Sequence, residues 1–226
     1  MSIQAEEFKA TTLVELAIAK IRRDILTGAF APGSKLRIEE LRNCYEIGAS
    51  PLREALSRLV SGGLVTAQGQ RGFRVAPVSM DDIRDITDTR RLLENALLAQ
   101  SIAAGDAEWE DSVRRSYEEL DRQHQALQET DGASWEAWEE ANDRFHETLV
   151  SACTSKWQLQ FRQVIYDQAV RYRRFVVLDR EQEIGAQEEH YQMLQAALAR
   201  DIEKSCALAD AHAERTFKMM ATRSSV

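Results

Sequence analysis

Three of the four histidines in the chain lie beside apolar stretches of three different predicted helices. His146 follows Asn142 by four residues, which places an amide oxygen and an imidazole on one face of a helix. His190 and His212 border the apolar faces of two later helices. Three histidines with a nearby oxygen ligand are typical of a divalent metal site, whereas a single one is usually a structural core residue. From spacing alone, a metal site and three structural histidines both remain open.

An arginine also interrupts an apolar stripe. Arg90 falls on a face that repeats at helical spacing, and Glu94 follows one turn later. Because an unpaired buried charge is expensive, Arg90 must reach water, pair with Glu94 or meet a ligand. The fourth histidine, His124, lies among polar residues and is expected to be solvated. The apolar residues of the Arg90 stripe are Ile83, Ile86, Leu93 and Leu97.

The composition is that of a globular protein. Of 226 residues, 44% are hydrophobic and 29% are charged. The three cysteines are odd in number and far apart, which argues against a disulfide framework and a cysteine zinc site. We see no secretory signal in the first ten residues and no apolar run of about 18 residues. A cytoplasmic protein without a membrane partner is therefore expected.

The charge and the turn residues divide the chain at Pro77. Residues 1–77 hold 11 Lys and Arg against 8 Asp and Glu, a net charge of +3, and residues 78–226 hold 18 against 29, a net charge of −11. All three prolines and seven of the ten glycines lie before residue 78. Because Gly and Pro mark turns, the first part should contain short elements and the second long helices. The predicted domains are residues 1–77 and 83–226, with a linker over 78–82.

The first 77 residues read as three helices followed by a hairpin. The helices are predicted in TTLVELAIAKIRRDILTG, RIEELRNCY and SPLREALSRLVSGG, where apolar residues recur at helical spacing. Ser50 is expected to cap the third helix, and Pro51 suits its first turn. The strand-like runs LVTAQ and FRVAPV flank a turn over Gly69–Gly72.

This order of elements matches a winged helix-turn-helix. The third helix would enter the major groove, where Arg53 could contact guanine or phosphate, and Arg71 at the hairpin tip could reach an adjacent groove. A small helical domain whose arginines are merely solvated is the alternative interpretation.

The remaining residues predict an antiparallel α-helical bundle, so the whole chain is expected to be mainly α. Few glycines and no proline interrupt this part of the chain. The predicted helices span approximately Met80–Ala104, Glu108–Glu129, Ser134–Ala152, Lys156–Leu178, Glu181–Ala199 and Asp201–Thr222.

The first part resembles the DNA-binding domain of GntR-family bacterial regulators. The similar strings are IRRDILTGAFAPGSKLRIEEL, GASPLREALSRLVSGGLV and QRGFRVAPVS. Many members have Ser-Arg where this chain has Gly48-Ala49, so one usual base-reading arginine is absent. The resemblance implies base and phosphate contacts at Arg53, Gln70, Arg71 and Gly72, with Arg37 and Ser50 as further candidates.

The second part resembles the FCD domain of the FadR-type branch of the same family. The similar elements include Arg90…Glu94, Asn142…Phe145-His146 and Glu189-His190. The resemblance implies a divalent ion, zinc with nickel or manganese as alternatives. It also implies an effector carboxylate held by Arg90, with Glu94 and, from the Arg171–Arg174 cluster, Arg173 in the same pocket. The implied metal ligands are Asn142, His146, His190 and His212.

Two finer points follow from the resemblance. Asn142 replaces the commoner Asp, so the site would hold metal less tightly but favour an anionic ligand. Asp143 could reach the same face, and the choice between the two stays open. The strings SPLREALS, RGFRVA and RYR are most similar to CsiR-type regulators, which respond to short dicarboxylates.

The sequence thus predicts a ligand-responsive repressor rather than an enzyme. A homodimer would place two recognition helices about one DNA turn apart, ~34 Å, on a near-palindromic operator. A small carboxylate bound at the metal would change their placement. The alternative functions are a metal-dependent hydrolase, with Glu189 or Glu94 as general base, and a helical adaptor with structural histidines.

Overall fold

The structure is a computed structural model that describes residues 12–69, 72–129, 134–176 and 186–223. The chain packs as two compact units. The first runs to Ile83 and also includes Tyr166–Val176, and the second contains the other helical segments. One long helix, α7 (Lys156–Val176), therefore contributes residues to both units.

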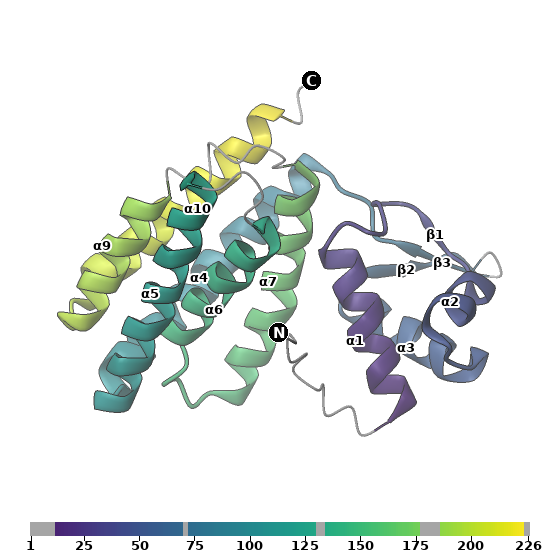
Figure 1. The fold of residues 1–226 in the computed structure, drawn as a ribbon, viewed down its shortest axis with the longest axis horizontal. Helices are drawn as coiled ribbons and strands as arrows, with labels where there is room; N and C mark the ends of the chain where they lie inside the picture. The colour runs from purple at the N-terminus through teal and green to yellow at the C-terminus, as the bar shows by residue number, and fades with distance from the viewer. Residues whose placement is uncertain (1–11, 70–71, 130–133, 177–185, 224–226) are drawn as a thin grey trace. The chain divides into compact units, whose positions relative to one another are not determined.

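Three helices and a small antiparallel sheet form most of the first unit (Figure 1). The sheet order is β1-β3-β2, so β3 pairs with both neighbours. The three predicted helices and the predicted hairpin are confirmed, and β1 is an additional strand. The result is the predicted winged helix-turn-helix. Its elements are α1 Leu13–Leu26, β1 Lys35–Leu36, α2 Ile38–Tyr45, α3 Ala49–Ser61, β2 Val65–Ala67 and β3 Phe73–Val75.

The core of this unit lies between α1 and α3. Ile21 and Ile25, one turn apart on α1, are buried, as are Leu52 and Leu56 on α3. Each buried aliphatic side chain of this size contributes about 1.5–3 kcal/mol relative to leaving it in water. This packing fixes α3 by its inner face and leaves the other face available to a partner.

Helix α3 begins before the predicted cap. The N-cap residue is Gly48, whose backbone is extended, and the helix starts at Ala49 without a side-chain cap hydrogen bond. Ser50 therefore lies within the first turn, and its side chain is exposed. The predicted capping role of Ser50 is wrong because a cap residue must lie outside the helical backbone.

The wing is formed by β2 and β3. Thr66 lies opposite Arg74, and Ala67 lies opposite Phe73. Gly72 has a φ of +90°, a conformation that favours glycine, and its carbonyl accepts a hydrogen bond from the backbone N–H of Gln68 at 2.9 Å. The predicted contacts Gln70 and Arg71 lie outside the described residues.

The C-terminal turns of α7 complete the first unit. Asp167 accepts two hydrogen bonds from the guanidinium of Arg22 on α1. The next residue, Gln168, donates to the carbonyl of Gly62 at the end of α3 at 2.8 Å. These bonds anchor one end of α7 to both long helices of the winged unit.

The described residues of the rest of the chain are mainly helical, and all six predicted helices are confirmed. Residues 177–185, at the predicted end of one helix and start of the next, lie outside the described residues. No helix in the described part of the chain is long and apolar enough to cross a membrane. The helices are α4 Met80–Ala104, α5 Ala107–Glu129, α6 Trp135–Leu149, α7 Lys156–Val176, α9 Gln187–Leu198 and α10 Ile202–Arg223.

Polar pairs show that α4 and α7 are antiparallel. Gln100 donates to Gln158 at 2.8 Å, and nearer the start of α4, Glu94 accepts from Arg162 at 3.2 Å. The residue numbers fall along one helix as they rise along the other, as the predicted antiparallel bundle requires.

Helix α6 packs in the centre of this bundle. Trp138 and Phe145 on its inner face are buried against the apolar residues of α4, α5 and α9. The start of α5 is held close to α6 because the indole of Trp109 donates to the carbonyl of Thr148 at 3.1 Å. At Gly105 a Cβ would lie 2.4 Å from the Trp109 ring, so only glycine fits there. This packing buries the side chain of His146 within the bundle.

Candidate functional site

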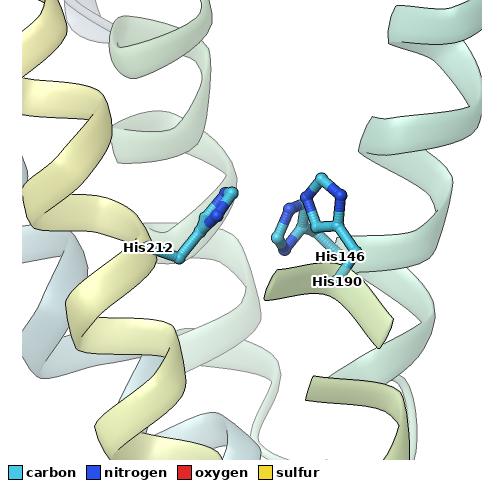
Figure 2. Close-up of side chains that lie close together, drawn as sticks. All are labelled: His146, His190 and His212. Carbon is cyan, nitrogen blue, oxygen red and sulfur yellow. The ribbon is translucent and has the colours of Figure 1, made fainter. Parts of the chain in front are cut away.

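Three buried histidines on three helices of the bundle come together. His146 lies on α6, His190 on α9 and His212 on α10. The ring centroids are 5.2 Å apart for His146 and His190, 5.1 Å for His146 and His212, and 4.9 Å for His190 and His212. One ring nitrogen from each lies within 4.8 Å of the others. Figure 2 shows the three rings facing one another from separate helices.

The surroundings favour the neutral form of His146 and His212. Burial, together with the nearby His212, His190 and Arg90, lowers the pKa of His146 well below its usual value. Burial also lowers the pKa of His212, although a hydrogen bond to Glu189 acts in the opposite direction. A neutral imidazole keeps an unshared electron pair on one nitrogen, which is what a metal ion requires.

The donor set fits a divalent cation. Nε2 of His146 is buried and accepts no hydrogen bond from any described residue. Leaving such a nitrogen unpaired costs about 1–3 kcal/mol, and a metal ion would satisfy it. Around tetrahedral zinc, with Zn–N bonds of about 2.0–2.1 Å, the nitrogens are roughly 3.4 Å apart, so only small side-chain movements are needed.

Asn142 is the better placed of the two candidate oxygen ligands. It lies on α6 one turn before His146, and only 2% of its surface is exposed. Asp143 is partly exposed. Both residues share a helix face with His146, so it is the deeper burial of Asn142 that favours it over Asp143.

Beside the histidines lies a small polar pocket. Arg90 and Glu94 line it together with His146 and His212, and the enclosed space is about 20 Å³, room for about one water molecule. Arg90 and Glu94 approach to 3.5 Å, so the expected pair within α4 exists and also faces the pocket. The other lining residues are Arg91, Asn95, Leu98, Leu149, Val150, Met193, Ala209, Asp210 and Ala213.

Arg162 on α7 is a site residue that the sequence reading missed. It is buried, its Nε approaches Glu94 at 3.2 Å, and it donates to the carbonyl of His146 at 3.2 Å. Neither Arg162 nor the predicted Arg173, which is also buried, lines the pocket itself, but Arg162 contacts the lining residue Glu94. The two arginines share one helical stripe, and at 1.5 Å per residue Arg173 lies about 16 Å farther along the axis. The sequence signal for Arg162 was this stripe, but the stripe gives no information on which of its arginines reaches Glu94.

Of the two exposed arginines of α3, Arg53 is the one without an ion pair to a described residue. By contrast, Arg58 pairs with Glu54 at 2.5 Å, and the predicted contact Arg37 pairs with Glu40 at 2.7 Å. The structure thus places an unpaired cation near the start of the recognition helix.

His124 departs from its expected exposure. It lies on α5 with only 7% of its surface exposed, and its Nε2 is 3.2 Å from the side-chain amide of Gln128. The expectation that it is solvated is wrong because the apolar side of α5, which packs on α6, reaches as far as this residue. It is not part of the histidine cluster.

Two family models match the chain. Residues 13–75 match the bacterial regulatory proteins of the gntR family, and residues 85–215 match the FCD domain. The first range covers the winged unit up to the end of β3. The second contains the three histidines, Arg90, Glu94 and Arg162.

Curated relatives are similar over most of their length. BphR of Paraburkholderia xenovorans (strain LB400), an uncharacterized HTH-type transcriptional regulator, is 41% identical over 209 residues, which are 92% of this chain and 85% of that protein. GlaR of Escherichia coli (strain K12), an HTH-type transcriptional repressor, is 36% identical over 198 residues, 85% of this chain and 88% of that protein. These names describe regulators and give no support to the hydrolase alternative.

Solved structures share the fold. E. coli McbR/YncC has a TM-score of 0.80 at 18% identity and covers 94% of this chain and 99% of its own. A putative GntR transcriptional regulator from Rhodococcus sp. RHA1 has a TM-score of 0.77 at 19% identity. That match covers 92% of this chain and 97% of the Rhodococcus chain. The chain belongs to the gntR family of bacterial regulatory proteins, carries an FCD domain, and is a DNA-binding transcriptional regulator rather than an enzyme.

Proposed function

We propose that this regulator is a cytoplasmic homodimeric repressor that responds to a small carboxylate bound beside a divalent metal ion. The observation that carries the proposal is the cluster of three buried histidines whose members His146 and His212 line one pocket with Arg90. In this proposal residues 1–77 bind DNA, 78–82 link the domains, and 83–226 sense the effector.

The metal would be held by His146, His190 and His212, with Asn142 as the oxygen ligand. Zinc is the proposed ion, with nickel or manganese as alternatives, because histidine-rich sites accept several divalent ions. When bound, the ion supplies two positive charges and an open coordination position for an anion. The protein's own part is to keep the three imidazoles buried and facing one another.

The charge around the pocket favours a carboxylate effector. Arg90 and Arg91 line the pocket and Arg162 contacts it through Glu94, so there are three positive charges, of which Glu94 and Asp210 offset two. A carboxylate entering this pocket would accept hydrogen bonds from Arg90, a strong charge-assisted contact. The space of about 20 Å³ is too small for a dicarboxylate, so in this proposal binding rearranges the groups that line it, and a switch needs such a difference between the free and bound states.

The effector proposal predicts a carboxylate-dependent rise in thermal stability that Arg90→Ala abolishes. A ligand at 100 times its Kd stabilises the folded state by about 2.7 kcal/mol, and removal of Arg90 removes its main cationic contact. The measurement is the thermal midpoint of zinc-loaded protein with a library of short mono- and dicarboxylates.

Arg122→Ala is the matched control because Arg122 is an exposed arginine paired with Glu119 on α5, away from the pocket. This variant should respond as the wild type does. A full response in Arg90→Ala would refute the assignment of Arg90, and no response to any carboxylate in the wild type would refute the effector class.

DNA binding would use α3 and the wing. Arg53 would contact base edges in the major groove, with Arg37 and Ser50 near the phosphates and Gln70, Arg71 and Gly72 at the wing. Two such units, related by the dimer axis, would bind a near-palindromic operator.

We place the dimer contact on the α4–α7 face of the FCD domain. Leu92 on α4 and Trp157 and Phe161 on α7 are 77%, 68% and 56% exposed, and the two aromatic rings stack with centroids 6.2 Å apart. Exposed large apolar side chains of this kind are typical of a surface that another subunit covers. A second copy would cover them.

This placement predicts that Phe161→Glu converts the dimer to monomers. In a two-fold interface the change occurs twice, so the loss is roughly 3–6 kcal/mol, a dissociation constant raised about 100-fold or more. Sedimentation equilibrium measures it. Ile202→Glu, at another exposed apolar residue, is the control and should leave the dimer intact. If the Phe161→Glu variant remains a dimer, the proposed location of the interface is wrong.

A further inference from the structure

Glu189 joins two of the helices that carry the histidine cluster. It precedes His190 on α9, yet its carboxylate reaches across to α10. Its Oε2 lies 2.8 Å from Nδ1 of His212, and its Oε1 lies 2.7 Å from Nε of Arg215. The carboxylate is therefore held at both oxygens, between the ring of His212 and a guanidinium one turn farther along α10.

The contact determines which nitrogen of His212 carries the proton. Two negatively polarised atoms, a carboxylate oxygen and a bare ring nitrogen, would repel each other at 2.8 Å. Nδ1 must therefore donate its N–H to Glu189, which leaves the electron pair of the neutral ring on Nε2. Rotation of the ring would break this hydrogen bond, so the contact also fixes the ring plane.

We propose that Glu189 is a positioning residue for the metal centre: it holds His212 in the tautomer and orientation that present Nε2 to the ion, and Arg215 holds Glu189 in turn. This inference rests on the proposed metal-dependent function. A carboxylate behind a metal-bound histidine also raises the basicity of the ligating nitrogen. Glu189 itself does not touch the ion.

The negative charge of Glu189 is balanced by a neighbouring cation. One oxygen of Glu189 contacts His212 and the other contacts Arg215, and the side chain is 30% exposed. The guanidinium of Arg215 thus offsets its negative charge. In this proposal the positions next to the ion are occupied by the three imidazoles.

The test compares zinc affinity in Glu189→Ala, Glu189→Gln and Glu188→Ala, measured on the full-length protein by competition with a chelating indicator. Losing such a carboxylate typically weakens metal binding 10- to 100-fold, which we expect for Glu189→Ala. Glu189→Gln keeps an oxygen that accepts from Nδ1–H, so it should recover most of the loss and retain a deficit of a few-fold. Glu188→Ala removes the same charge one residue away, on the exposed side of α9, and should match the wild type.

A spectroscopic measurement separates positioning from general stability. The visible absorption bands of the Co²⁺-loaded protein report ligand geometry, so they should change in Glu189→Ala and shift slightly in Glu189→Gln. A variant that lost only a structural ion pair would have a lower thermal midpoint without metal but unchanged Co²⁺ bands and zinc affinity.

The outcomes are distinct. Wild-type zinc affinity and Co²⁺ bands in Glu189→Ala would overturn the inference while leaving the metal centre in place. If that variant does not fold, unchanged affinity and bands in Glu189→Gln would overturn it instead. A wild-type protein that binds neither ion would refute the proposed metal centre itself, and the role of Glu189 with it.

Discussion

Arg53→Ala is expected to abolish specific operator binding while leaving the protein folded. Arg53 is exposed near the start of α3 and forms no ion pair with a described residue, so its removal should not disturb the core. A bidentate arginine–base contact is worth about 1–3 kcal/mol. A dimer makes the contact twice, so the loss is about 2–6 kcal/mol, or roughly 30-fold or more in affinity.

The measurement needs an operator fragment, obtained by selecting genomic fragments on the wild-type protein. Fluorescence anisotropy then compares this fragment with a scrambled competitor at several salt concentrations, because non-specific affinity depends strongly on salt. Circular dichroism checks the helical content. Arg122→Ala again serves as the control. Unchanged discrimination in Arg53→Ala would show that α3 does not read the operator as proposed.

Replacing His146 and His190 together by glutamine should remove the metal ion. Two of the three imidazole ligands are lost, and a single histidine with Asn142 cannot hold zinc at micromolar concentration. Glutamine keeps most of the side-chain volume at these two buried positions. Because zinc at 1,000 times its Kd stabilises the fold by about 4.1 kcal/mol, that stabilisation should disappear in the variant.

Metal content after native purification and the zinc-dependent rise in thermal midpoint are the two measurements. His124→Gln is the control, because His124 is also a buried histidine of the bundle but lies outside the cluster. It should retain stoichiometric metal. Full metal content in the double variant would reject the site, and loss of metal in the His124 variant would mean that general destabilisation causes the effect.

Local patterns were sufficient to predict the helices and the hairpin of this protein, but not the short strand β1. The spacing of Ile21 and Ile25, or of Leu52 and Leu56, marks a helix face, because helix periodicity is a property of neighbouring residues. The hairpin followed equally from strand-like runs beside glycines. The error at Ser50 is of a different kind: Gly48 and Ser50 are both accepted caps, and only the backbone shows which of them lies outside the helix.

Exposure along a helix was harder to predict. His124 lies among polar neighbours in the sequence, yet the packing of α5 on α6 buries it. Arg162 and Arg173 occupy the same stripe of α7, and nothing in that stripe distinguishes the arginine that reaches Glu94 from the one that does not. In each case burial depends on where a second helix lies.

The sequence by itself determined the mainly helical fold, the winged helix-turn-helix and the residue types from which a metal and carboxylate site can be built. Only the tertiary structure decided that His146, His190 and His212 meet, that Arg162 joins Arg90 and Glu94, and that Glu189 contacts His212 rather than a residue of its own helix. The physical reason is the separation along the sequence between the residues that interact. Helix formation depends on residues within a few turns, whereas these contacts depend on how separate helices pack, which local periodicity does not encode.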